Sequence, residues 1–192
     1  MEFVSGKSLE NYFNCNLGYK VISIGNYSTD SKYIESNTYV DYSYGVNFEK
    51  LIAHKNALAM ILNDKTSVGT ILGRVLLLDD ENSYIINQRS VVMRLKNKNL
   101  CAKYFYYLIN SDAVRSVIVK KSKPGTQIYL NLPDVLDLSI TYTPNIEEQN
   151  AVASILSDMD NEIEALEQKL AKTRQLKQGM MQQLLTGKIR LV

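Results

Sequence analysis

The sequence is poor in histidine and cysteine, from which zinc sites and many nucleophilic centres are built. Among its 192 residues there are one histidine, His54, and two cysteines, Cys15 and Cys101, far apart in the chain. A structural zinc site takes four such ligands. His54 alone makes no case for a Ser–His–Asp arrangement, and its place in "LIAHKNALAMI" favours a strand-edge or surface histidine. The sequence also has no glycine-rich phosphate loop and no GxGxxG motif. We therefore expect a non-catalytic chain that binds no metal.

Long apolar runs are missing as well. No stretch of about 18 apolar residues occurs, which excludes a transmembrane helix. The N-terminal residues "MEFVSGKSLENYF" show no basic stretch followed by an apolar one, so we expect no secretory signal. A cytoplasmic location follows, with both cysteines reduced. The net charge is only +2, so local charge patterns must indicate the partners.

What the chain does contain is a series of short runs rich in Val, Ile and Leu, interrupted by Asn, Asp, Gly and Ser. Turns at such close intervals favour antiparallel strands over βαβ units. We predict an α+β fold in which residues 1–144 form a mixed globular domain with a curled, mainly antiparallel sheet. Residues 100–123 read as one or two helices, with Ser111 capping the second, and residues 123–135 as a loop. The expected strands are residues 20–24, 57–62, 70–78, 83–86, 90–95 and 136–144.

The last part of the chain, residues 145–192, reads as one long helix. Asn145 can cap it, with Glu148 in the position of a capping box, and Gly187 is a natural stop. About 40 residues at 1.5 Å each give a rod of roughly 60 Å. Such a rod cannot be buried along its full length against the preceding domain, so part of it must project or find another helix.

This helix carries a heptad pattern. Eight of its ten a and d positions are apolar, and only Thr173 and Lys177 interrupt them. A Glu167–Lys169 "EQK" stretch resembles part of a nuclease motif, but its place in the heptads favours a solvated flank. The pattern predicts a helix seam that consists of Val152, Leu156, Met159, Ile163, Leu166, Leu170, Met180 and Leu184.

Charge indicates the direction of the partner helix. Residues 147–168 hold seven acidic and no basic side chains, whereas residues 169–192 hold six basic and no acidic ones. Antiparallel copies would place acid against base, so we predict an antiparallel coiled coil with another copy or a similar helix. A monomeric helix matched to its own macrodipole is the alternative, but the dipole acts only over the terminal turns.

Residues 94–123 are basic and rich in tyrosine. They hold eight Lys or Arg against one acid, Asp112. Phosphate contact is one interpretation of these charges, and a solvated helix face is the other. Four consecutive aromatic residues, 104–107, cannot all face one groove of a partner, so we expect them to turn toward the core.

The C-terminal third holds several short motifs in a fixed order. A Gly-Thr/Asn-Leu loop and a Pro-x-x-Glu-Glu-Gln start lead into the long helix, which ends near Leu-Leu-Thr-Gly-Lys. The residues are Gly125, Thr126, Asn131, Leu132, Pro144, Glu147, Glu148, Gln149 and Leu184 to Lys188. In this order and spacing the segment resembles the specificity (S) subunit of type I restriction-modification systems. Upstream, "YKVISIGNYSTDSKYI", "SVGTILGRVLLL" and "YIINQRSVVMRL" look like the family's recognition domain. Unlike the common member, this sequence has one recognition domain and one helix, as in a half-length subunit or a fragment, and "SITYTPN" departs from the usual "IPLPP".

The resemblance implies that residues 1–144 are a target-recognition domain that reads half of a bipartite site on double-stranded DNA. Residues 145–192 would be a dimerisation and spacer helix, paired with itself or another S chain, that docks the methyltransferase (M) subunits. S-adenosylmethionine, ATP and Mg²⁺ would then belong to the M and restriction (R) subunits, and this chain would bind no cofactor. Polar residues at strand ends are candidates for DNA contact, namely Lys65, Thr66, Ser67, Gln88, Arg89, Lys120, Lys121, Lys123 and Gln127.

Two other interpretations stay open at this point. A truncated S-like assembly or regulatory protein would pair with other subunits without reading DNA, against which the basic residues 94–123 argue mildly. A small nuclease would need spaced carboxylates and a lysine around a metal, and the sequence offers no such constellation.

Overall fold

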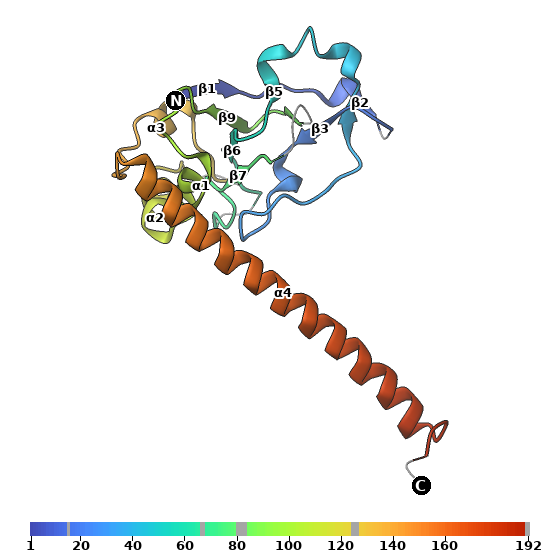
Figure 1. The fold of residues 1–192 in the computed structure, drawn as a ribbon. Helices are drawn as coiled ribbons and strands as arrows, with labels where there is room; N and C mark the ends of the chain where they lie inside the picture. The colour runs from blue at the N-terminus through green and yellow to red at the C-terminus, as the bar shows by residue number, and fades with distance from the viewer. Residues whose placement is uncertain (15, 66–67, 80–83, 124–126, 191–192) are drawn as a thin grey trace. The chain divides into compact units, whose positions relative to one another are not determined.

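The computed structural model describes residues 1–190 except 15, 66–67, 80–83 and 124–126 (Figure 1). Its contacts divide the chain into two compact units, Met1–Asn150 and Ala151–Val192, which are described separately. The first unit holds the sheets and the short helices, and the second holds most of the long helix. No helix among the described residues combines the length and the apolar character needed to cross a membrane.

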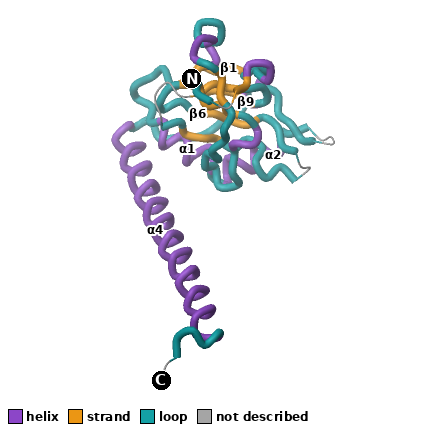
Figure 2. Tube along the Cα trace, turned by 90° about the vertical axis from the view of Figure 1, so that its right-hand side faces the viewer, coloured by secondary structure: helices purple, strands orange, loops and turns teal. Residues whose placement is uncertain are grey.

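Short strands and helices follow one another along the first unit (Figure 2). Short 3₁₀ turns lie at Glu10–Tyr12, Ile24–Asn26, Tyr42–Tyr44 and Glu49–Leu51. The strands are β1 (Glu2–Ser5), β2 (Phe13–Asn14), β3 (Tyr19–Ile22), β4 (Tyr39–Val40), β5 (Ile52–Ala53), β6 (Leu58–Ile61), β7 (Val75–Leu77), β8 (Tyr84–Ile86) and β9 (Ser90–Arg94). The helices are α1 (Ala102–Asn110), α2 (Asp112–Lys120), α3 (Leu132–Leu136) and α4 (Ile146–Leu185).

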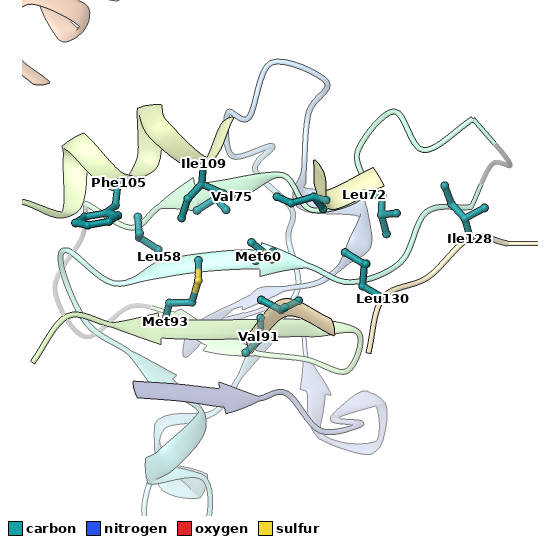
Figure 3. Close-up of a cluster of buried hydrophobic side chains, with 12 residues drawn as sticks. Leu58, Met60, Leu72, Val75, Val91, Met93, Phe105, Ile109, Ile128 and Leu130 are labelled. Carbon is teal, nitrogen blue, oxygen red and sulfur yellow. The ribbon is translucent and has the colours of Figure 1, made fainter. Parts of the chain in front are cut away.

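The first sheet has the order β1-β9-β6-β7 and is antiparallel throughout. Successive side chains of a strand point to opposite faces, and both faces of β6 are buried. Leu58 and Met60 pack with Phe105 and Ile109 of α1 on one face (Figure 3). Ala59 and other residues of the opposite face pack in a second cluster with side chains of the other sheet. Burial on both faces explains why residues 57–62 read as one continuous apolar run.

The second sheet has the order β2-β4-β3-β8-β5, in which β3 and β8 pair in parallel and the other pairs are antiparallel. The prediction of a mixed, mainly antiparallel α+β fold is thus confirmed, but the single curled sheet is wrong. β8 and β9 are separated only by the turn 87–89, yet each belongs to a different sheet. The hydrophobic pattern of a strand shows that it is buried and does not show which strand it pairs with.

Most predicted strands occur with shorter bounds, and two differ from the expectation. Of residues 70–78 only β7 is a strand, because the chain turns at Gly73, whose φ is 70°. The strand predicted at 136–144 is wrong, since Leu136 still belongs to α3, Asp137 lies in a turn and residues 138–144 form no strand. The preceding loop prediction missed α3, where Asn131 and Asp134 form a reciprocal capping box and a proline lies in the first turn.

The predicted helix caps are largely confirmed. Ser111 Oγ accepts a hydrogen bond from Val114 N at 3.5 Å at the start of α2. Asn145 Oδ1 accepts from Glu147 N at 2.8 Å at the start of α4. The capping box itself differs, because the Glu148 carboxylate accepts from the Thr143 hydroxyl at 2.6 Å and Asn145 N donates to the same hydroxyl oxygen at 3.4 Å. Thr143 therefore takes the role expected of Glu148.

The long helix ends where the sequence predicts. α4 stops at Leu185, and Gly187 follows with a φ of 72°, a conformation that glycine adopts without strain. Gly187 N donates to Leu184 O, and Ile189 N donates to Gln183 O, both at 3.2 Å. These bonds satisfy carbonyl groups that the last turn leaves without partners.

Gln149 is completely buried within the first unit and ties the start of α1 to the segment before α4. Its Oε1 accepts from Cys101 N and its Nε2 donates to Thr143 O, both at 2.8 Å. We expect Gln149→Ala to lower the free energy of unfolding by about 2 kcal/mol, because both buried backbone groups lose their partners. Thermal unfolding checks this, with the exposed Gln168→Ala as the matched control. Equal stability of the two variants would contradict this role.

Candidate nucleic-acid interface

Three chain segments meet at one end of the first sheet, where β6 ends and β9 begins. Leu62 N donates to Arg89 O at 2.8 Å, Leu130 N donates to Leu62 O at 2.8 Å, and Asp64 N donates to Ile128 O at 3.0 Å. We call residues 62–65, 87–89 and 127–130 the loop cluster. These backbone bonds hold three segments from distant parts of the sequence side by side. Side chains from all three segments can therefore contribute to one binding surface.

Arg89 and Gln127 meet within the loop cluster. Gln127 Oε1 accepts from Asn63 Nδ2 at 3.1 Å and from Arg89 Nη1 at 3.4 Å. Arg89 has a left-handed φ of 67°, and both Arg89 and Gln127 are exposed. Asn63 is buried, and its Oδ1 has no hydrogen-bond partner among the described residues. Arginine and glutamine side chains are the kind that read guanine and adenine edges.

Gln88 has a different surrounding. Its Nε2 donates to Glu10 Oε1 at 2.7 Å, and Asn87 Nδ2 donates to the same oxygen at 3.4 Å. A hydrogen bond from the Ser8 hydroxyl is the main cause that lowers the pKa of Glu10, so this carboxylate stays ionised. Gln88 is thus held beside a negative charge, which would repel a nearby phosphate.

Arg115 of α2 fixes residues 69–72, which lie in the loop between β6 and β7. Its guanidinium donates to Leu72 O at 3.1 Å, to Thr70 O at 3.1 Å and to Gly69 O at 3.4 Å. Asp64 adds a bond by accepting from Ile71 N at 2.8 Å. Arg115 is buried, and burial lowers the pKa of its guanidinium. Arg115 therefore supports the fold. It does not belong to a phosphate-binding surface, although phosphate contact was one interpretation of the basic segment 94–123.

The lysines after α2 are partly engaged within the fold. Lys121 pairs with the Asp137 carboxylate, which lowers the pKa of Asp137. Lys123 Nζ lies 3.7 Å from Asp134 Oδ2. Lys65 and Lys120 are exposed, while Thr66 and Ser67 lie outside the described residues, as do Gly125 and Thr126. The structure thus brings Lys65, Arg89 and Gln127 into one cluster with Gln88 beside Glu10.

The aromatic residues 104–106 turn toward the core, as predicted. Phe105 is buried in the core of the first sheet, and Tyr104 and Tyr106 pack against that core.

Sequence reasoning missed Asn63 and Glu10, which contact Gln127 and Gln88. Neither carries a local signal, because their partners lie 64 and 78 residues away. Within the described residues no group of three His, Cys, Asp or Glu side chains is placed to hold a metal ion.

Comparison with known proteins extends these observations. The sequence model of the type I restriction modification DNA specificity domain matches residues 2–175. The chain is 26% identical over 191 residues to the type I restriction enzyme MjaVIII specificity subunit of Methanocaldococcus jannaschii, covering 100% of this chain and 44% of that protein. It is 25% identical over 172 residues to the putative type I restriction enzyme MjaX specificity subunit of the same organism, covering 88% and 40%.

Two solved structures share the fold. The type I restriction-modification S subunit from M. genitalium superposes with a TM-score of 0.62 at 21% identity, over 95% of this chain and 42% of that one. A chain from a study of complex assembly and conformational transition of the type I R-M system gives a TM-score of 0.63 at 14% identity, over 95% and 42%. The chain thus spans less than half the length of these relatives, and with 174 of its residues matched by the family model, it belongs to the family of type I restriction-modification DNA specificity domains.

Proposed function

We propose that this chain reads one half of a bipartite DNA site for a type I restriction-modification complex. The match of residues 2–175 to the DNA specificity family carries this proposal. The loop cluster supports this proposal, because its Arg89 and Gln127 side chains are exposed and its three segments are joined by backbone hydrogen bonds. Phosphate contacts would position the domain, and base-edge contacts would supply the sequence information.

In this proposal the first unit recognises DNA, and α4 sets the spacing of two half-sites and docks the methyltransferase subunits. The chain itself performs no catalysis and binds no cofactor. The methyltransferase subunit would bring S-adenosylmethionine, and a restriction subunit would use ATP and Mg²⁺. A second copy of this chain, or another S chain, would provide the second half-site.

The long helix supports pairing with a second copy. Met159, Ile163, Leu166 and Leu170 of its seam are between 49% and 58% exposed, which is a large apolar surface for a single helix. In an antiparallel pair with its two-fold axis at Gln168, every a position faces a d position of the other copy, for example 156 opposite 180. The charge pattern changes sign between Gln168 and Lys169. The heptad pattern allows axes about 3.5 residues apart, and the change of charge sign selects the one at Gln168 among them.

A second candidate function is assembly without DNA reading, and specific contacts favour it. Lys121 and Lys123 pair with acidic residues, and Gln88 binds Glu10. These interactions reduce the positive charge that a DNA-binding surface needs. A short S-like chain of this kind would pair with other subunits and change the assembly of the complex.

Selection of DNA from a random pool separates the two candidates. The chain would be co-purified with a methyltransferase subunit, and bound duplexes would be sequenced. An interrupted palindrome establishes sequence reading by a two-fold assembly, as expected for symmetric dimers. Two unrelated half-sites indicate a second, different S chain. A stable protein complex without enrichment of any sequence supports the assembly function.

Arg89 allows a sharper prediction at the level of one base pair. We expect Arg89→Ala to weaken binding to the selected site by about 2 kcal/mol and to relax the preference at one G·C position, because a bidentate arginine contact to guanine is lost. Lys32→Ala is the matched control, since it removes an exposed positive charge of the same domain that is not among the candidates for DNA contact. Repeating the selection with each variant checks this. Unchanged base preference in Arg89→Ala would show that Arg89 reads no base.

A further inference from the structure

A second basic region lies at the other end of the first sheet. Leu58 at the start of β6 pairs with Met93 near the end of β9, so residues 54–57 and 94–103 lie at the opposite end from the loop cluster. They line a cleft of about 520 Å³. A strand of four or five residues separates the two regions by roughly 15 Å, so the cleft and the loop cluster are distinct sites.

The cleft is strongly positive. Lys55, Lys96, Lys98 and Lys103 line it and are exposed. Among the described residues that line it, none is Asp or Glu. From outside the lining, Glu2 Oε2 lies 3.5 Å from Lys96 Nζ and 3.8 Å from Arg94 Nη1. One carboxylate beside this group of cations leaves the concave surface positive, so it would attract an anion with more than one negative charge.

The side chain of Arg94 is engaged within the fold and fixes the backbone beside the cleft. Arg94 Nη2 donates to Lys50 O and Ile52 O at 2.8 Å, its Nη1 lies 3.8 Å from Glu2 Oε2, and its Nε is buried. Cys101 precedes α1 without a side-chain cap. The first amide groups of a helix have no intrahelical acceptors, and Ala102 and Lys103 of this turn line the cleft.

We propose that this cleft binds phosphate groups. The positive charge of the four lysines, the first turn of α1 and a volume larger than one phosphate fit two adjacent phosphate groups. Those groups belong either to the DNA backbone or to a free anion such as pyrophosphate. The cleft does not depend on the loop cluster, so phosphate binding here is separable from base reading.

The variant Lys55→Gln/Lys98→Gln tests this proposal, because neither lysine takes part in the contacts that fix Arg94 or α1. Lys32→Gln/Lys188→Gln is the matched control, which removes two exposed charges elsewhere. Two measurements are made on the full chain. Calorimetry measures the binding of pyrophosphate, and a salt titration measures DNA binding of the chain in complex with a methyltransferase subunit.

If the phosphates come from DNA, the slope of log K against log salt falls by about 1 to 2 in the cleft variant and not in the control. If they come from a free anion, pyrophosphate binding weakens at least tenfold in the cleft variant, and the salt slope stays unchanged. Each result supports the cleft, and the pyrophosphate measurement does so even where the chain reads no DNA. Unchanged values in both measurements, or equal losses in the control, would overturn the proposal.

Discussion

Reversing three acidic charges of α4, in the variant Glu162→Lys/Glu164→Lys/Glu167→Lys, is expected to separate the proposed dimer at low salt. In the antiparallel pair each of these residues faces the basic half of the other helix. Two copies carry about six changed contacts at roughly 0.5 kcal/mol each, so the loss is about 3 kcal/mol. That corresponds to a roughly 100-fold weaker dimer, which sedimentation at several protein concentrations measures.

The second set of changes is expected to restore the pair. Adding Lys169→Glu/Lys172→Glu/Arg174→Glu exchanges the two charge blocks, so that acid again faces base. In a parallel pair the combined variant would keep like charges together and gain nothing. If the first triple variant dimerises as strongly as the unchanged chain at low salt, charge does not direct the pairing.

High salt provides an internal control for this experiment. Exposed ion pairs are screened at high ionic strength, so the difference between the triple variant and the unchanged chain is expected to shrink there. The apolar seam is unaffected by salt screening. A difference that persists at high salt would indicate damage to the helix itself.

Gly6→Ala is expected to destabilise the first unit by about 3 kcal/mol. A Cβ at this position would lie 1.8 Å from the carbonyl oxygen of Asn87 and 2.5 Å from its carbonyl carbon. Both atoms belong to the backbone, so the chain must shift to make room. Gly6 N also donates to Ser90 O at 2.9 Å, which keeps the two segments together.

The same change is expected to disturb DNA recognition, because the turn 87–89 carries Arg89. Thermal unfolding measures the stability, with a predicted fall of about 10 °C, and DNA binding below that temperature measures the effect on recognition. Gly25→Ala is the control, since an added Cβ there meets no atom within 4 Å, and we expect a change within about 0.5 kcal/mol. Equal stability of the two variants would mean that the segments do not approach so closely.

The sequence by itself determined the features that depend on one continuous segment. The long helix, its heptad seam and its charge blocks follow from spacing within 40 residues. The caps at Ser111, Asn145 and Gly187 follow from backbone groups that a helix end leaves unpaired. The family was also apparent, because its motifs around α4 keep their order and spacing.

Only the tertiary structure decided which predicted site residues share a surface. Arg115 proved to be buried, because three carbonyl groups of a distant loop surround its guanidinium. Arg89 and Gln127 meet because β6 and β9 pair and the segment 127–130 pairs with residues 62–64. The division into two sheets has the same origin. Strand pairing joins residues far apart in the chain, and its register depends on the packing of the whole domain, which no local pattern records.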